Sequence, residues 1–192
     1  LNKSNEVKES IEYTFGFNGY MEHLIKIQNL YNKKQINPCK FNNKKISIKK
    51  IYYPSIEFNK AIKNDVKIEK KNIIITGPNA AGKTTILKSV LYNLILSQQV
   101  GIGFYEKANI KCYDYFHCYL NIPDTSGRDS LFQAEARRCK EILDSINNET
   151  NETNETNETK KNKEKNHFCI FDELYSGTNP FEAVGSAYSY LN

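Results

Sequence analysis

Residues 77–84 read Gly-Pro-Asn-Ala-Ala-Gly-Lys-Thr, the pattern of a phosphate-binding P-loop. The loop follows an apolar run at 73–76, which predicts a buried strand, and it precedes a helix-like pattern at 85–97. Glycines let backbone N–H groups surround phosphate oxygens, and the amino end of a helix adds a favourable dipole. A P-loop between a strand and a helix predicts that the chain binds ATP or GTP.

Two side chains of this loop have specific expected roles. The Lys83 ammonium should reach the β- and γ-phosphates, and the Thr84 hydroxyl should bind Mg²⁺. The predicted nucleotide-binding residues of this segment are Gly77, Pro78, Asn79, Ala80, Ala81, Gly82, Lys83, Thr84 and Thr85.

A second element of a nucleotide site follows about 90 residues later. The apolar run at 167–171 ends in Asp172 and Glu173, as in a Walker B strand. Asp172 at the strand end can bind Mg²⁺ directly or through water. Glu173 is suited to polarise the water that attacks the γ-phosphate, as a general base. The Asp-Glu pair favours ATPases over small GTPases, which would also carry an Asn-Lys-x-Asp motif, absent from this chain.

Length and composition fit one domain with a small appendage. The chain has 192 residues and a formal net charge of +5. It has no apolar run long enough to cross a membrane and no signal peptide, so we expect an intracellular protein, cytoplasmic or nuclear. The five cysteines are odd in number and irregularly spaced, which disfavours a disulfide framework or a metal site. A start without Met and an end inside a helical pattern suggest a piece of a longer protein.

The remaining segments are predicted from periodicity and composition. Residues 1–18 should be weakly ordered, 19–31 should form an amphipathic helix, and 131–146 another helix. Short strands are expected at 46–48, 51–53, 66–68 and within 109–120. The lysine-rich stretch at 32–50 could contact nucleic-acid phosphates, although a solvated basic surface is the favoured interpretation. The segment 147–166, with four tandem Asn-Glu-Thr triplets, is expected to be a disordered insertion.

Four stretches resemble the ATPase domain of the MutS family of DNA mismatch-repair proteins, which belongs to the wider ABC ATPase group. The first is 72–85, where Pro78 and Asn79 in the loop are more diagnostic than the P-loop itself. The second is Asn64-Asp65-Val66, just upstream. The third is 126–135, in which Ser130, Phe132 and Glu135 match a family signature, and the fourth is 172–179, Asp-Glu-Leu-Tyr-Ser-Gly-Thr-Asn.

This resemblance implies an α/β fold: a P-loop NTPase of the ABC ATPase type, with a mostly parallel central sheet flanked by helices and an antiparallel β subdomain. Residues 1–50 would be the remnant of a preceding helical region with a basic linker. Residues 51–192 would be the ATPase domain, truncated at its carboxyl end. Ala61 stands where many members carry an aromatic residue that stacks on adenine, so Phe58, Ile62 or a residue outside this chain would have to take that role.

The resemblance also implies ATP hydrolysis with Mg²⁺ in a composite site between two subunits. Ser130 would contact the partner subunit's ATP in trans, whereas its plain alternative is a helix N-cap. The subunits would form a homodimer or heterodimer that couples ATP state to the binding of mismatched DNA, through regions outside this chain. The alternatives are another ABC-type ATPase of recombination or chromosome maintenance, a MutS relative without mismatch recognition, a non-catalytic nucleotide-binding module, and a P-loop kinase.

Overall fold

The computed structural model describes residues 2–69, 71–120, 130–155 and 165–191. It divides into two compact units, Leu1–Lys111 and Cys112–Asn192. Residues 126–129 of the third family-like stretch, and 156–164 of the low-complexity segment, lie outside the described residues.

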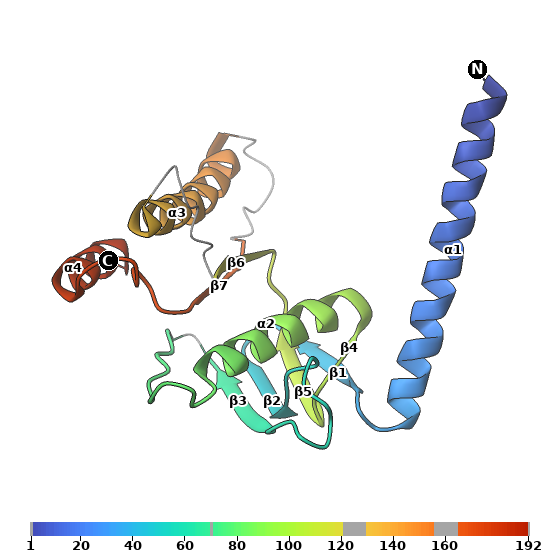
Figure 1. Ribbon diagram of the computed structural model, residues 1–192, viewed down its shortest axis with the longest axis horizontal. Helices are drawn as coiled ribbons and strands as arrows, with labels where there is room; N and C mark the ends of the chain where they lie inside the picture. Colours follow the sequence, from blue (N-terminus) through green and yellow to red (C-terminus); the bar gives the residue numbers. More distant parts are fainter. Residues whose placement is uncertain (1, 70, 121–129, 156–164, 192) are drawn as a thin grey trace. The chain divides into compact units, whose positions relative to one another are not determined.

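The first unit is a mixed five-stranded sheet with the order β3-β2-β5-β1-β4. β1 and β5 run parallel, whereas the other neighbouring strands are antiparallel. Helix α2 lies against one face of this sheet (Figure 1). The elements of the unit are α1 (Asn2–Asn32), β1 (Asn37–Asn42), β2 (Ile46–Ile51), β3 (Asn64–Ile68), α2 (Lys83–Val100), β4 (Ile102–Gly103) and β5 (Lys107–Lys111).

The apolar alternation of the strands explains how this unit buries its core. Ile46 and Ile48 on β2 are buried, and Ile48 lies opposite the buried Ala108 on β5. The intervening Ser47 lies opposite Asn109, so polar residues gather on the other face. Helix α2 adds Leu94, which is fully buried. The period of two in the strands therefore sets which sheet face receives the helix.

One buried amide ties α2 to the rest of the first unit. Asn93 is fully buried, and its Nδ2 donates to the carbonyl oxygens of Tyr52 (3.2 Å) and Ser89 (2.9 Å). Its Oδ1 accepts the Phe104 N–H. Gly103 lies so close that a Cβ there would meet Asn93 Oδ1 at 2.9 Å. These contacts fix the position of α2 along the sheet.

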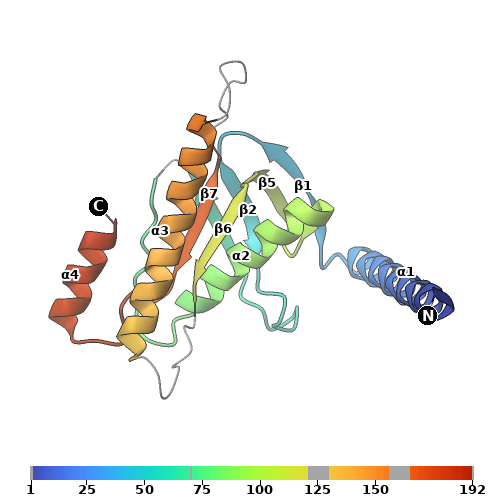
Figure 2. The same ribbon diagram turned by 90° about the horizontal axis from the view of Figure 1, so that it is seen from above.

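The second unit contains two parallel strands, β6 (Tyr115–Tyr119) and β7 (His167–Phe171). Helices α3 (Leu131–Glu155) and α4 (Pro180–Leu191) complete it. Helix α3 runs alongside the two strands (Figure 2). The core of this unit is formed by Tyr119, Cys139, Ile142 and Tyr175, against which Ala183 and Ala187 of α4 pack.

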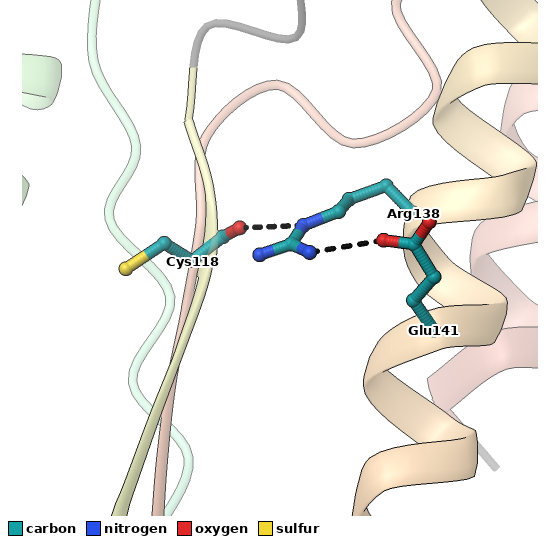
Figure 3. Close-up of polar contacts among 3 residues, drawn as sticks. All are labelled: Cys118, Arg138 and Glu141. Atoms are coloured by element: carbon teal, nitrogen blue, oxygen red, sulfur yellow. Dashed lines mark hydrogen bonds and ion pairs between the residues drawn. The ribbon is translucent and has the colours of Figure 1, made fainter. Parts of the chain in front are cut away.

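Helix α3 is also held to β6 by a polar contact. The Arg138 Nε donates to the carbonyl oxygen of Cys118 at 3.1 Å, and its Nη1 lies 3.0 Å from Glu141 Oε2 (Figure 3). The carboxylate one turn further along the helix thus orients the guanidinium toward the strand. This contact sets the distance between the helix and the strand that precedes it.

Four sequence-based expectations need correction. Residues 46–51 form the single strand β2, so the separate strand expected at 51–53 is wrong. Residues 73–76 form no strand, and Ile74 is 87% exposed, because no strand among the described residues pairs with this run. Residues 2–18 are not weakly ordered but helical, since α1 covers Asn2–Asn32 without interruption. Helix α3 continues to Glu155, past the expected end at 146 and into the Asn-Glu-Thr triplets. For residues 156–164, which lie outside the described residues, the predicted disordered insertion stays a prediction.

Local sequence signals account for the ends of two helices. Gly101 ends α2 with a left-handed φ of 74°, and its N–H donates to the Ser97 carbonyl. Helix α4 begins at Pro180, with Asn179 Oδ1 accepting the N–H groups of Phe181 and Glu182. The expected α/β class is confirmed, but the five-stranded sheet is mixed, with three antiparallel strand pairs, rather than mostly parallel as expected. No helix within the described ranges is long and apolar enough to cross a membrane.

Replacing Asn93 by alanine should destabilise the protein by about 1–3 kcal/mol, because it leaves the Tyr52 carbonyl and the Phe104 N–H without their partner. Urea unfolding measures this change. The matched control is Asn59→Ala at an exposed position, which should shift the unfolding free energy by less than about 0.5 kcal/mol. Equal effects of the two substitutions would contradict the role of Asn93.

Candidate functional site

The P-loop residues lie in the first unit, and the backbone leads directly into α2. Ala80 and Gly82 both adopt left-handed conformations, with φ of 61° and 89°. Gly82 is the N-cap position of α2 and makes no side-chain cap hydrogen bond. The first N–H groups of a helix have no partner within the helix. A helix end without a capping side chain, next to an exposed loop, suits a phosphate ligand.

Lys83 turns back over this loop. Its Nζ donates to the carbonyl oxygens of Gly77 and Pro78, each at 3.0 Å. The ammonium therefore lies beside the backbone that a phosphate would contact, at the amino end of α2. The residues 77–85 fit a triphosphate in charge, exposure and backbone conformation, although the strand expected before them is absent.

The two candidates for stacking on adenine lie in different surroundings. The Phe58 ring packs edge-on against Tyr52 at 5.5 Å between centroids, and Lys63 Nζ lies 3.7 Å from the Phe58 centroid. The Phe58 ring therefore already packs against other side chains of the protein. Ile62 is 81% exposed.

The acidic pair lies in the second unit, directly after β7. The Asp172 N–H donates to the Tyr119 carbonyl at 2.9 Å, which continues the pairing with β6 by one residue. Glu173 follows with a φ of 51°, and Tyr175 has a φ of 57°. Left-handed conformations cost a non-glycine residue about 1–2 kcal/mol and gather at functional sites. The chain therefore leaves the strand in a strained turn that carries the carboxylates.

Ser130 is the first residue of a capping box. Its Oγ accepts the Gln133 N–H at 3.3 Å, while its N–H donates to Gln133 Oε1 at 3.0 Å. The N-cap alternative considered from the sequence is thus observed. The side chain is exposed at the amino end of α3, and its contact with a partner subunit's ATP stays a prediction.

The structure brings the amino end of α3 together with the loop that follows the acidic pair. Gly177 is adjacent to Leu131, and Glu135 accepts hydrogen bonds from the loop. The resemblance to the MutS family includes Glu135 in a signature but implies no contact for its side chain. A single glutamate between alanines on a polar helix gives no sequence signal of burial. The shared Mg²⁺ site of Thr84 and Asp172 would join residues of two different units and stays a prediction.

Two histidines lie on neighbouring strands of the second unit. His117 Nε2 and His167 Nδ1 are 2.9 Å apart, and their rings stack at 5.2 Å between centroids. Burial lowers the pKa of His117, and the nearby His167 and Arg138 lower it further. The neutral form of His117 is therefore favoured in the folded protein.

Comparison with known proteins places these features in a family. The chain is 28% identical over 165 residues to Endonuclease MutS2 of Ligilactobacillus salivarius, covering 83% of this chain and 19% of that protein. It is 30% identical over 152 residues to Endonuclease MutS2 of Agathobacter rectalis, covering 77% and 17%. It is 30% identical over 145 residues to the DNA mismatch repair protein MSH3 of Debaryomyces hansenii, covering 72% and 12%. No protein-family model matches the chain.

The fold is a mixed α/β architecture in which a glycine-containing loop leads into a helix and an acidic pair follows a parallel strand. The similarities extend over most of the chain, and the chain belongs to the MutS family. It spans 19% or less of the length of these three relatives.

The low pKa of His117 predicts that the protein loses stability in acid. The unfolded chain takes up a proton below about pH 6.5, the ordinary value, while the folded His117 still resists it. The stabilisation is complete above pH 6.5 and is lost as the pH falls through the lower folded pKa. The expected slope in that interval is up to about 1.4 kcal/mol per pH unit.

Urea unfolding at several pH values measures this slope. His117→Gln should flatten it, whereas His23→Gln, at an exposed position on α1, should leave it unchanged. An unaltered slope in His117→Gln would refute the assignment.

Proposed function

We propose that this chain is the ATP-binding and ATP-hydrolysing part of a MutS-family protein that couples the state of its nucleotide to DNA binding. Two sequence motifs carry the proposal, because each lies at the end of a helix or strand. The loop 77–84 leads into α2, and Asp172 and Glu173 follow directly after β7. This order of parts is the one that P-loop ATPases of the ABC type use for phosphoryl transfer.

The chain's residues divide the work as follows. The backbone of 77–82 and the amino end of α2 hold phosphate oxygens, and Lys83 exchanges its two carbonyl contacts for phosphate. Thr84 and Asp172 would hold Mg²⁺, which would neutralise charge on the phosphates. Glu173 is exposed at the turn after β7, where it can orient a water molecule and accept its proton.

The composite dimer is the second part of the proposal. Ser130 lies exposed at the amino end of α3, where a phosphate of the partner subunit's ATP would meet both a hydroxyl and a helix dipole. The hydroxyl's contact with the Gln133 N–H leaves its own hydrogen free to donate. The dimer would be a homodimer or a heterodimer, and DNA would bind through regions beyond this chain.

A second candidate function has support in the names of the relatives. Relatives named Endonuclease MutS2 and relatives named DNA mismatch repair protein MSH3 both match most of the chain. A MutS relative that acts on DNA without mismatch recognition is therefore the alternative. Binding of the intact protein to mismatched and to fully paired duplexes distinguishes the two functions. A preference for the mismatched duplex supports repair, whereas equal binding to both duplexes supports the alternative.

Glu173→Gln should leave ATP binding within about twofold and lower kcat by at least about a hundredfold, because the amide cannot accept the proton of the attacking water. Equilibrium binding of ATP and steady-state phosphate release measure the two effects. Glu182→Gln, a carboxylate in the first turn of α4, serves as the control and should retain turnover. Turnover within about threefold of the parent in Glu173→Gln would show that Glu173 is not the base.

A further inference from the structure

Glu135 is a buried carboxylate on α3 that the phosphoryl-transfer scheme does not use. It is 1% exposed, although charged side chains are almost never buried without partners. A carboxylate removed from water needs hydrogen-bond donors that compensate for the lost hydration. The identity of those donors therefore indicates what the side chain does.

Three of the donor groups come from the loop that follows the acidic pair. Oε1 accepts both the N–H and the hydroxyl of Ser176, each at 2.9 Å. Oε2 accepts the Gly177 N–H at 3.1 Å. One side chain of α3 thus satisfies two successive backbone N–H groups, more than 40 residues away in the sequence.

The packing of Gly177 supports the same connection. A Cβ at this position would lie 2.7 Å from Leu131 Cγ and 2.9 Å from the Phe132 backbone nitrogen. The loop backbone therefore rests directly on the first turn of α3, with no room for a side chain between them. Ser130, the capping residue, immediately precedes this turn.

Tyr119 extends the network to the sheet. Its hydroxyl accepts the Tyr175 N–H at 3.1 Å, and its carbonyl accepts the Asp172 N–H. Burial raises the pKa of Tyr119, and the hydrogen bond and charge of Glu135 raise it further. The turn from Asp172 to Gly177 is consequently held at its start by β6 and at its end by α3.

We propose that Glu135 is a positioning residue that fastens the loop after Asp172 and Glu173 to the helix tip that carries Ser130, so that the two move as one body. The inference rests on the proposed function for its effect on turnover. Under that function, Asp172 and Glu173 serve the ATP of their own subunit, and Ser130 serves the partner's ATP. A shift of the acidic turn during hydrolysis would then displace Ser130, which links the two nucleotide sites mechanically.

The test replaces Glu135 by glutamine in the intact protein. Glutamine keeps the size of the side chain, but its NH₂ group cannot accept a loop N–H, so at least one of the three hydrogen bonds is lost. Hydrogen exchange of a peptide spanning 173–179 reads the fastening directly and does not depend on ATP. We expect that exchange to accelerate by about tenfold or more. Steady-state hydrolysis should show kcat lowered by about tenfold with KM for ATP unchanged.

Asp144→Asn is the matched control, which likewise changes a carboxylate to its amide at an exposed position on the same helix. It should leave both the exchange and kcat as in the parent protein. Exchange of an α2 peptide reports whether the protein remains folded. If Glu135→Gln does not fold, Ser176→Ala, which removes only the hydroxyl donor, should still give a smaller acceleration of the 173–179 peptide.

The outcomes separate the inference from the proposed function. If hydrogen exchange of the 173–179 peptide is unchanged in both Glu135→Gln and Ser176→Ala, Glu135 does not hold the loop. Accelerated exchange with an unchanged kcat overturns the positioning role. Absence of ATP hydrolysis by the unaltered intact protein overturns the proposed function, while the exchange measurement still decides whether Glu135 holds the loop.

Discussion

The parallel pairing of β6 with β7 is the constraint on which the second unit depends. The ladder ends where Tyr119 lies opposite Phe171, and the next N–H, that of Asp172, still donates to Tyr119. Backbone hydrogen bonds between the two strands therefore set where the acidic pair begins. Helix α3 attaches to the same strand through Arg138 and the Cys118 carbonyl, so the strand pair positions both the turn and the helix.

In the first unit, a buried amide positions the helix that follows the P-loop. Leu94 and its apolar neighbours hold α2 on the sheet, but apolar contacts permit small shifts along the helix axis. Asn93 removes that freedom, because its amide must meet two backbone groups outside the helix, the Tyr52 carbonyl and the Phe104 N–H. The amino end of α2, where Lys83 lies, inherits its position from this contact ten residues further along the helix.

The sequence was most informative where a local pattern determines structure by itself. The period of α2, the stop at Gly101 and the start of α4 at Pro180 were all predictable. The run at 73–76 was not, since apolar character does not reveal whether a partner strand is available. Residues 2–18 lack a clear apolar stripe, yet they are helical and include the Lys8–Glu12 pair at i,i+4 spacing. The burial of Glu135 could not be read locally, because loop residues distant in the sequence cause it.

The left-handed backbone at Glu173 reverses the usual effect of glycine on the stability of the fold. Glycine weakens most folds, but at a φ of 51° it would relieve about 1 kcal/mol of backbone strain. A search for thermostable variants would therefore favour glycine at this position and would remove the carboxylate. At the end of β7, the residue that carries the proposed chemistry therefore makes the fold less stable than glycine would.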